Sequence, residues 1–596
     1  MVSEDKQPMA EPSFYTDVLI VGSGPSGGTA AACLSMMGIS NVLIDKYSST
    51  APTPRAHITN QRTMEVFRDL GIEDAARAIA TPQDSMAEHV YARDLVGEEI
   101  GRMLTWYNHP RWKMDHDLAS PCSVCDLPQT EMEPLLVRTA LQSGSVIRWL
   151  TEYLGHEQDR DGVTVYLRDR LEKRDYAVRC RYLIGCDGAK SQVAEDAGLS
   201  FVSKTAKGGS IGVYFKGDLS QYVSHRRGDM YWLLQPGNGM GGHGVGVLRM
   251  VKPWDHWVAT AGYDEETGPP ELTHELAKKI IFSLIGENRI NVDVLDISTW
   301  TVNDVYATAY SKSRVICVGD AVHRHPPMNG LGSNTCVGDA YNLSWKLALV
   351  LKGQAGAGLL DSYSLERQPV GEYVVKRANK SMGTIPPLVD AMGLSGVQSA
   401  EAHKAILEKR KEKTADGAAM RLRIRKAIDA TLVGFNTLGA ELNQRYSEGA
   451  FVSDGSLDPG FAKDRDFHHQ PGTRPGWHLP HVWLLDRRQR KVSSLDLCGQ
   501  GRFTVLTGIG GEAWIEAAAA SSERLSVDIQ CHMIGPGHDH DDIYGDYATM
   551  REIEEDGALL IRPDMFIGWR AQTSAQSNNL EAVMRQILAL PPQNVE

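Results

Sequence analysis

Three glycines near the start of the chain have the spacing of a loop that binds the pyrophosphate of a dinucleotide. Gly22, Gly24 and Gly27 follow an apolar run and precede a stretch of small residues. Such glycines allow a tight turn, let a pyrophosphate approach backbone N–H groups at a helix N-terminus, and keep that helix close to its sheet. Asp45 ends the next apolar run and can accept hydrogen bonds from the ribose of an adenosine. The pattern predicts a dinucleotide-binding loop.

A second set of glycines with the same spacing stands in a different context. Gly237, Gly239 and Gly242 connect the apolar runs 230–235 and 244–251, and a strand rather than a helix follows them. We expect a hairpin loop here, because a phosphate site of this kind needs a helix N-terminus behind the glycines. One dinucleotide-binding unit leaves a choice between a nicotinamide dehydrogenase and a flavoprotein.

Two further segments favour the flavoprotein. Residues 182–191 and 314–323 resemble the Asp-Gly and Gly-Asp motifs of the group A flavin-dependent aromatic hydroxylases. Asp320 ends a buried run and can accept hydrogen bonds from ribityl hydroxyls. The loop 326–334 leads into a helix N-terminus, whose amides can hold the electron-rich edge of a reduced isoalloxazine. Besides the glycine loop, the predicted cofactor contacts are Asp187, Asp320, Gly330, Gly332, Ser333 and Asn334.

The resemblance extends over nearly the whole chain from Thr16 and is to the phenol hydroxylase branch of that group. The segments that carry it are 53–65, 125–129, 230–232, 319–334, 474–476 and 495–499. It implies FAD as cofactor, NADH or NADPH as co-substrate, and hydroxylation of a phenol ortho to its hydroxyl by O₂ through a flavin C4a-hydroperoxide. It also implies a thioredoxin-like C-terminal domain without a redox Cys-x-x-Cys, and Cys498 indeed has no cysteine at that spacing.

The resemblance also assigns roles to single residues. His57 matches the base of the biphenyl-type enzymes; a histidine with the usual pKa of about 6.5 is neutral at working pH and can accept a phenolic proton. Asp126 is a candidate to orient the imidazole or stabilise the imidazolium. Arg55 is expected to face the flavin pyrophosphate, where a bidentate donor is useful, and Gln129 the ribityl chain.

The substrate chamber, or the approach of the nicotinamide, is expected at Trp232, Arg249, Pro327 and Met328. The chain departs from the common family pattern at Ala194, because the Asp-Gly motif usually ends with an arginine. No arginine cluster for a 2′-phosphate is readable either, so the choice between NADH and NADPH stays open.

Two other functions fit the same motifs. One is a Baeyer–Villiger or ring-opening oxygenation of an aromatic polyketide, and the other is a flavin-binding protein without catalytic activity. We predict no metal site. Cys122 and Cys125 have a metal or redox spacing but no partner pair, and the His/Asp run 538–542 lies beside turn-forming glycine and proline.

Composition narrows the class of protein. The 596 residues are 42% hydrophobic and 23% charged, and no apolar run approaches the roughly 18 residues of a membrane span. The net charge of −13 argues against nucleic acid and anionic lipid as partners. Nine cysteines without a readable signal peptide fit a reducing compartment, so we expect a cytoplasmic protein. The expected assembly is a homodimer.

The elements that position these residues form an α/β plus α+β fold. We expect a Rossmann-like, glutathione-reductase-like FAD-binding domain interleaved with a β-sheet substrate domain, followed by the thioredoxin-like domain. The expected strands are 17–21, 41–45 and 314–318. One helix is expected to follow the first glycine loop and end near residue 37, and further helices are expected over 334–351, 403–413 and 421–429. The expected divisions are a leader (1–15), the FAD-binding domain in three parts (16–110, 111–200 and 305–397), the substrate sheet (201–304), a helical connector (398–450) and the tail (451–596).

Overall fold

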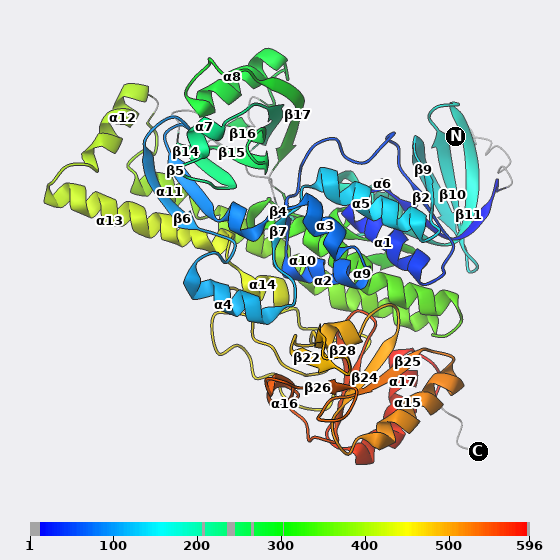
Figure 1. Ribbon diagram of the computed structural model, residues 1–596. Helices are drawn as coiled ribbons and strands as arrows, with labels where there is room; N and C mark the ends of the chain where they lie inside the picture. The colour runs from blue at the N-terminus through cyan, green and yellow to red at the C-terminus, as the bar shows by residue number, and fades with distance from the viewer. Residues whose placement is uncertain are drawn as a thin grey trace.

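A computed structural model describes residues 12–204, 209–234, 245–263, 268–301, 303–397 and 399–592. It shows a mixed α/β molecule with two large sheets interleaved along the chain and a separate C-terminal layer (Figure 1). The first strand begins at Tyr15, two residues before the predicted strand 17–21. Most of the predicted leader, residues 1–11, lies outside the described residues.

The first sheet forms the dinucleotide-binding half of the molecule. Its order is β19-β20-β11-β1-β2-β8, with β10 and β9 added beyond β11. The strands are β1 (Tyr15–Val21), β2 (Asn41–Ile44), β8 (Val146–Arg148), β9 (Thr151–Gln158), β10 (Val163–Asp169), β11 (Arg174–Gly185), β19 (Ser311–Lys312) and β20 (Val315–Cys317). Strand β1 runs parallel to both β2 and β11, so the predicted strand–helix–strand unit is confirmed.

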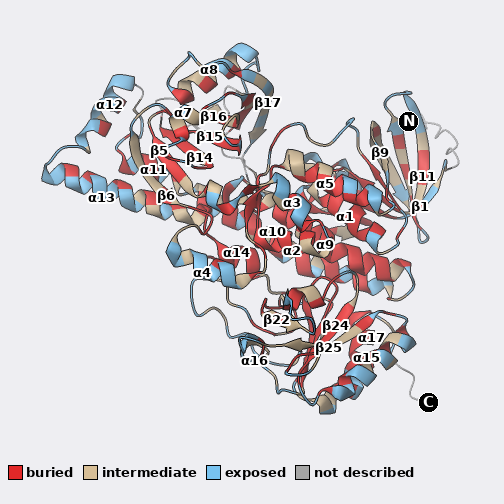
Figure 2. Ribbon diagram, in the orientation of Figure 1, coloured by how far each residue is buried: buried red, intermediate tan, exposed pale blue. Residues whose placement is uncertain are grey.

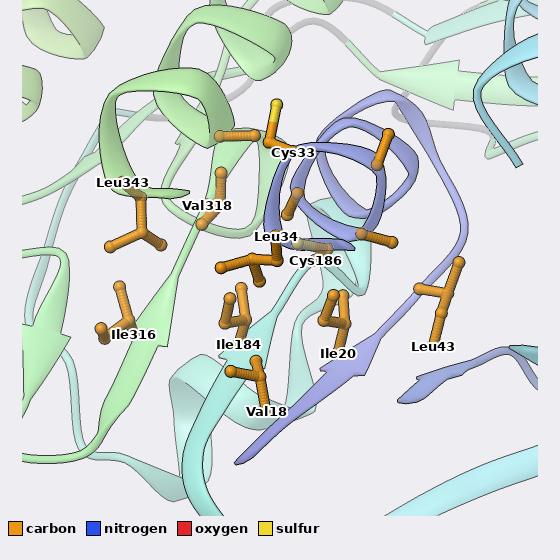
Figure 3. Packing of buried hydrophobic residues seen from close by; sticks show 14 of the residues in the cluster. Val18, Ile20, Cys33, Leu34, Leu43, Ile184, Cys186, Ile316, Val318 and Leu343 are labelled. Atoms are coloured by element: carbon orange, nitrogen blue, oxygen red, sulfur yellow. The ribbon is translucent and has the colours of Figure 1, made fainter. Parts of the chain in front are cut away.

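Two helices pack side by side against this sheet: α1 (Pro25–Met36) and α9 (Gly332–Leu351). Figure 3 shows Leu34 of α1 and Leu343 of α9 above Ile20, Ile184 and Ile316 of the strands. Full burial of each such side chain contributes about 1.5–3 kcal/mol. Because α1 consists mostly of Gly, Ala, Ser and Cys, its backbone can approach both the sheet and α9 closely.

The second sheet has the order β17-β13-β16-β15-β14-β5-β6. Its strands are β5 (Glu88–Ala92), β6 (Glu99–Leu104), β13 (Gly209–Lys216), β14 (Met230–Leu234), β15 (Val245–Lys252), β16 (His256–Tyr263) and β17 (Asp293–Thr301). Residues 88–104, which the sequence analysis assigned to the FAD-binding domain, thus belong to the second sheet. The reason is the parallel pairing of β5 with β14, a contact between distant segments that leaves no local signal. The predicted hairpin loop at 237–242 lies outside the described residues.

Helices cover both faces of this second sheet. Helix α8 (His274–Ile285) packs on one face, and α11 (Ile385–Ala391) and α13 (Ala415–Ala430) on the other. With α12 (Ala400–Lys409), α13 extends away from the body of the molecule, and Figure 2 shows that its outer side is exposed. Helices are thus present in both segments where the sequence predicts them, 403–413 and 421–429, although both begin earlier and the first also ends earlier.

Short elements join the two sheets. A small sheet has the order β3-β7-β4, from β3 (Ile58–Thr59), β7 (Cys125–Asp126) and β4 (Thr81–Pro82). A second small sheet contains β12 (Phe201–Lys204), β18 (Asp304–Ala307) and β21 (His323–Arg324). The helices around them are α2 (Gln61–Asp69), α3 (Glu73–Ile79), α4 (Pro110–Ala119), α5 (Gln129–Gln142), α6 (Gln192–Asp196) and α10 (Asp361–Met382).

The C-terminal layer contains a sheet with the order β25-β24-β27-β28. It is built from β24 (Phe503–Thr507), α15 (Glu512–Leu525), β25 (Ile529–Met533), β27 (Ala558–Ile561), β28 (Ile567–Ala571) and α17 (Leu580–Ile587). A second small sheet, β23-β22-β26, comes from β22 (Trp483–Asp486), β23 (Lys491–Ser493) and β26 (His540–Asp541). All nine cysteines are free thiols, and Cys498 is buried.

A buried ion cluster docks the C-terminal layer on the long helices. Arg562 is fully buried, and its Nη1 and Nη2 donate to the two carboxylate oxygens of Glu366 at 2.7 and 2.9 Å. Lys346 of α9 adds a contact to Glu366 at 2.8 Å, and Asp564 pairs with Arg562 from the opposite side. Charges taken out of water this way stay stable only while every partner is present.

Among the described residues, no helix is long and apolar enough to cross a membrane.

Replacing Arg562 by methionine should lower the free energy of unfolding by about 3–5 kcal/mol, because it leaves the Glu366 carboxylate buried with too little positive charge. The measurement is the thermal unfolding midpoint, together with the rate at which protease removes the C-terminal layer. The control is Arg524→Ala, which breaks the pair with Glu581; the Arg524 side chain is 59% exposed, so this change should cost only about 0–1 kcal/mol. Equal stability losses in both variants would contradict a buried docking charge.

Candidate functional site

The glycine loop before α1 has the shape that a phosphate site requires. Gly22 has φ +102°, and a Cβ atom there would lie 2.3 Å from the carbonyl oxygen of Cys186. At Gly27 a Cβ atom would lie 1.9 Å from the Gly22 carbonyl oxygen, whereas at Gly24 its nearest neighbour is Glu133 Oε1 at 3.7 Å. Gly22 and Gly27 are therefore needed by the fold. Gly24 leaves open the space in front of the first amides of α1, which have no side-chain cap.

Asp45 braces this loop from the end of β2. Its Oδ2 accepts from the backbone N–H of Ser23 at 2.8 Å and from the Ser23 hydroxyl at 2.6 Å. Its Oδ1 accepts from the backbone N–H of Tyr47 at 3.0 Å. The half-buried carboxylate thus lies beside the loop, where the sequence predicts a ribose contact.

Asp320 lies at the same edge of the first sheet. Gly319 before it has φ +67°, and a Cβ atom there would lie 2.2 Å from Ser26 Oγ in the first turn of α1. The second and third motifs therefore meet in space. The Asp320 side chain is exposed and accepts a weak hydrogen bond from Cys336 Sγ at 3.6 Å, so its carboxylate can still accept from ribityl hydroxyls.

Asp187 has a different environment. Its Oδ1 accepts from the Ser191 hydroxyl at 2.6 Å, and its Oδ2 accepts from the Val193 backbone N–H in the first turn of α6 at 3.1 Å. Burial raises the pKa of this carboxyl. Because both oxygens are bonded within its own loop, the structure gives Asp187 a part in shaping the chain beside Gly22.

The N-terminus of α5 holds the loop that carries Arg55. Gln129 donates from its backbone N–H to the Ala56 carbonyl at 2.7 Å and from Nε2 to Glu133 Oε1 at 2.5 Å. Glu133 Oε2 accepts from the backbone N–H of Ala51 at 2.7 Å, and burial raises the pKa of Glu133. Arg55 itself is exposed and can reach a bound anion. The sequence analysis missed Glu133, because a lone glutamate inside a helix carries no motif.

The N-terminus of α9 lies against the segment that carries His57. Asn334 Nδ2 donates to the Ile58 carbonyl at 2.8 Å, and its Oδ1 accepts from the Asn60 backbone N–H at 3.0 Å. Gly330 has φ +62°, and a Cβ atom there would lie 2.7 Å from Ile58 Cβ. Gly332 and Ser333 form the first turn of α9, which has no side-chain cap. The Asn334 amide thus ties the His57 segment to the predicted flavin-facing helix.

His57 and Asp126 face each other across the small sheet. Ile58 of β3 pairs with Asp126 of β7, and His57 Nδ1 lies 3.3 Å from Asp126 Oδ1. Both residues are buried. The contact predicted between them is present. Because a neutral imidazole that donates from Nδ1 accepts at Nε2, Nε2 is the atom that can take a proton.

The environment keeps His57 uncharged. Burial lowers its pKa, the nearby positive charge of Arg249 lowers it further, and the attraction of Asp126 offsets these effects only in part. His57 is therefore a neutral acceptor at neutral pH.

Arg249 of β15 joins two carboxylates from different parts of the fold. Its Nη2 donates to Asp126 Oδ2 at 2.6 Å, and its Nη1 donates to Asp229 Oδ2. Asp229 also accepts from Trp106 Nε1 at 3.0 Å and lies 3.2 Å from His89 Nε2. Although burial works to raise the pKa of Asp229, its interactions with His89 and Arg249 hold it at about 2. The sequence analysis missed Asp229 and His89, because only the pairing of β5 with β14 brings them together.

Trp232 and Met328 lie in one apolar cluster, which extends to Ile58 beside His57. Trp232 is stacked on Tyr91 at 14° with 6.1 Å between ring centroids, and its Nε1 donates to His89 at 3.3 Å. The cluster lies between the second sheet and helices α11 and α13. Pro327 is exposed at the turn before Met328. Three of the four predicted chamber residues, Trp232, Arg249 and Met328, are thus buried, and Arg249 reaches the His57–Asp126 pair directly.

FAD fits the residues that converge here. The uncapped first turn of α1 and the space in front of Gly24 suit a pyrophosphate, and the exposed Asp320 and Arg55 suit ribityl and phosphate groups. Within the described part of the chain, no cluster of three or more His, Cys, Asp or Glu side chains could hold a metal ion.

Comparison with known families agrees with this site. A family model described as an FAD binding domain matches residues 15–378, and one described as the C-terminal part of aromatic-ring hydroxylases matches residues 472–591. The chain therefore belongs to the FAD-binding aromatic-ring hydroxylases.

Among its relatives are two phenol-modifying enzymes. The chain is 48% identical over 577 residues to 2,4-dichlorophenol 6-monooxygenase of Delftia acidovorans, covering 96% of this chain and 98% of that protein. It is 45% identical to phenol 2-monooxygenase of Pseudomonas sp. (strain EST1001), covering 94% and 90%. A crystal structure of the flavin-dependent monooxygenase PieE with FAD and substrate is similar at a TM-score of 0.93, with 40% identity and coverage of 98% and 100%.

Gly24→Ala should fold normally and bind FAD poorly, because the added methyl group makes only an ordinary 3.7 Å contact with Glu133 Oε1 but would obstruct the pyrophosphate. We expect FAD binding to weaken about 10-fold or more, since a hydrogen bond to a charged group is worth about 1.5–3 kcal/mol. The measurement is FAD affinity by fluorescence, beside the unfolding midpoint of the apoprotein. Gly358→Ala, where the new Cβ would lie an ordinary 3.5 Å from Ala589, is the control. Unchanged FAD affinity in Gly24→Ala would contradict this placement of the pyrophosphate.

Proposed function

We propose that the protein is a monooxygenase that uses FAD, NADH or NADPH, and O₂ to hydroxylate a phenol ortho to its hydroxyl group. The observation that carries the proposal is the neutral, buried His57, whose Nδ1 faces Asp126 beside an apolar cluster and the N-terminus of α9. The names of the two phenol monooxygenases, at 45% and 48% identity, support a phenolic substrate.

The cofactor-binding roles follow from the positions described above. Gly22, Gly24 and Gly27 would form the pyrophosphate loop, Asp45 would hold the ribose, and Arg55 the phosphates. The proposed contacts to the ribityl chain and the ring are Gln129, Asp320, Gly330, Gly332, Ser333 and Asn334, while Asp187 would serve the cofactor site by shaping the chain beside Gly22. When bound, the flavin supplies electron transfer and oxygen activation, and the protein supplies position and electrostatics.

His57 would be the base. Its Nε2 would accept the phenolic proton and make the ring more electron-rich, while Asp126 stabilises the imidazolium that forms. The positive charge of Arg249 that disfavours the imidazolium also favours a neighbouring phenolate. Asp229 holds the Arg249 guanidinium in place beside Asp126.

The apolar cluster would exclude water from the ring. Trp232 and Met328 are 2% and 4% exposed, and both would line the chamber, with Pro327 at its rim. A dry chamber strengthens the charge interactions around His57 and keeps water away from the activated oxygen.

A polyketide oxygenation is the second candidate function. A relative named tetracenomycin A2 monooxygenase-dioxygenase, from Streptomyces glaucescens, is 31% identical and covers 96% of this chain. Product mass and retained aromatic absorbance distinguish the two reactions. Oxygen uptake with NAD(P)H and a phenol distinguishes both from a non-catalytic flavin-binding protein.

The C-terminal layer would be a thioredoxin-like domain without redox function. Its chain order, strand–helix–strand with parallel β24 and β25 followed by the antiparallel pair β27–β28 and α17, supports that fold. Burial raises the pKa of Cys498, which opposes thiolate chemistry there. We further propose a cytoplasmic location, which the free cysteines of the chain support, and a homodimeric assembly.

Replacing His57 by alanine should cut coupled hydroxylation by about 10²- to 10⁴-fold, the usual contribution of a general base. FAD binding should persist, and more H₂O₂ should form per NAD(P)H oxidised. High pH should partly restore the rate, because the free phenol then ionises in bulk. Asp126→Asn should show a weaker form of the same defect. Unchanged coupling in His57→Ala, measured as product per NAD(P)H, would place the base elsewhere.

The rate of coupled hydroxylation by the wild-type enzyme should fall at acid pH, and this acid limb of the pH profile should lie below the ordinary histidine pKa of about 6.5. The sign follows from the lowered pKa of His57: its neutral form persists to lower pH than in a free imidazole. The measurement is coupled hydroxylation between about pH 4 and 9, and His57→Ala should lack this acid limb. An acid limb well above pH 6.5 would contradict the assignment.

NAD(P)H oxidation should be slow until a phenol binds. A panel of phenols, scored for substrate-stimulated NAD(P)H oxidation, would test the enzyme class and identify the substrate group together. Equal flavin reduction rates with and without every phenol tested would count against an aromatic hydroxylase.

A further inference from the structure

Helix α2 begins immediately after the segment that carries His57. Its N-cap is Asn60, whose side chain accepts from the Thr63 backbone N–H at 3.0 Å. The Asn60 backbone N–H donates to Asn334 of α9. Any shift of α2 along its axis would therefore move the His57 segment directly.

The same helix holds the segment that leads to Asp126. Gln61 Nε2 donates to the carbonyl oxygens of His116 and Cys122 at 2.7 and 2.8 Å. Glu65 Oε1 accepts from the Ser120 hydroxyl at 2.7 Å. Gln61 and Glu65 are 0% and 1% exposed, so water cannot replace these bonds. Both members of the His57–Asp126 pair thus depend on α2.

The third side of α2 faces the C-terminal layer. Arg62 Nη2 donates to the Asp564 carbonyl oxygen at 2.8 Å, and its Nη1 lies 2.8 Å from His478 Nε2 and 3.0 Å from Glu65 Oε2. Arg62 is 9% exposed. Figure 1 shows the C-terminal layer directly beneath α2 and α9.

Two further contacts lie at the other end of the helix. Arg68 donates from Nε and Nη2 to the two oxygens of Asp496 at 2.6 and 2.9 Å. Asp69 Oδ1 accepts from the Gln500 backbone N–H at 2.9 Å. The C-terminal layer therefore grips α2 at both ends.

We propose that the C-terminal layer positions the His57–Asp126 pair through α2, with Arg62 as the positioning residue that connects them. This rests on the proposed role of His57 as the base. Strand β3, which directly follows His57, and β7, which carries Asp126, have only two residues each, so their own pairing gives this pair little rigidity. The 3.3 Å contact between Nδ1 and Oδ1 is at the long end of hydrogen bonding, where a small shift breaks it.

Removing Arg62 could change the pKa of His57 in two ways, by loosening the contact with Asp126 or by removing a positive charge, and the two changes have opposite signs. The charged groups that act on the His57 pKa are Arg249, Asp126 and Asp229, which lie on β15, on β7 and just before β14. Loosening the contact with Asp126 removes an attraction and lowers the pKa of His57. Loss of the Arg62 positive charge, acting through space, would raise it. The direction of the change therefore separates the two causes.

The experiment compares the holoenzyme with Arg62→Met and His478→Phe. The first measurement is the His57 pKa, by NMR titration of isotopically labelled histidines, with the His57 signal identified by its loss in His57→Ala. In Arg62→Met we expect this pKa to fall by about 0.5 to 1, a part of the effect of a neighbouring opposite charge. His478→Phe removes one hydrogen-bond acceptor that the C-terminal layer offers to Arg62, and it should lower the His57 pKa by a smaller amount.

The second measurement is coupled hydroxylation. In Arg62→Met the product formed per NAD(P)H should drop about 2- to 10-fold and the acid limb should move to lower pH, while phenol-stimulated flavin reduction stays near wild type. Arg62→Lys, which can still donate to the Asp564 carbonyl, should recover part of both effects. If Arg62→Met does not fold, His478→Phe carries the same test.

Val505→Ala is the matched control. It opens a cavity in the core of the C-terminal layer, away from α2, and should lower the unfolding midpoint without changing the His57 pKa. An unchanged or raised His57 pKa in Arg62→Met and His478→Phe would overturn the proposal that the C-terminal layer positions the pair. An unchanged loss of activity at acid pH in His57→Ala would instead overturn the base assignment, and the NMR titration would still test the positioning through α2.

Discussion

The structure depends on one buried cation shared between two carboxylates. Arg249 of the second sheet bonds to Asp126 of the small sheet and to Asp229 beside β14, and Asp229 is held in turn by His89 and Trp106. Burying such charges costs several kcal/mol per ion, and the cost is recovered only when every partner is in place. This requirement aligns the second sheet with the small sheet β3-β7-β4, because Asp126 lies on β7 and the other partners lie on or beside strands of the second sheet.

That alignment sets the chemistry at His57. A histidine beside a lone carboxylate tends to be protonated, but here the carboxylate is shared with Arg249 and the surroundings are apolar. His57 is therefore neutral and oriented at the same time, with Nδ1 toward Asp126 and Nε2 as the remaining acceptor. Orientation without protonation is the state that a general base needs.

The same kind of interaction attaches the C-terminal layer. Arg562, Glu366 and Lys346 form a second buried cluster between this layer and the long helices α9 and α10. Buried ion pairs add little net stability, but they penalise every misaligned arrangement. Together with the contacts of Arg62 and Arg68 on α2, this cluster gives the C-terminal layer one defined position beneath the helix that leads from His57.

The local units could be predicted from the amino-acid sequence: the Gly22–Gly27 loop between β1 and α1, Asp320 at the end of a buried strand, and the long helix after Gly330. These depend on apolar periodicity and on backbone positions that only glycine can occupy, and both are written in neighbouring residues. The resemblance to a known family paired His57 with Asp126. Long-range packing was needed to show that residues 88–104 join the second sheet, that Asp187 bonds within its own loop, and that Asp229 and His89 complete the charge network. Each of these depends on contacts between segments far apart in the chain, and no local pattern records which distant residue will supply the partner.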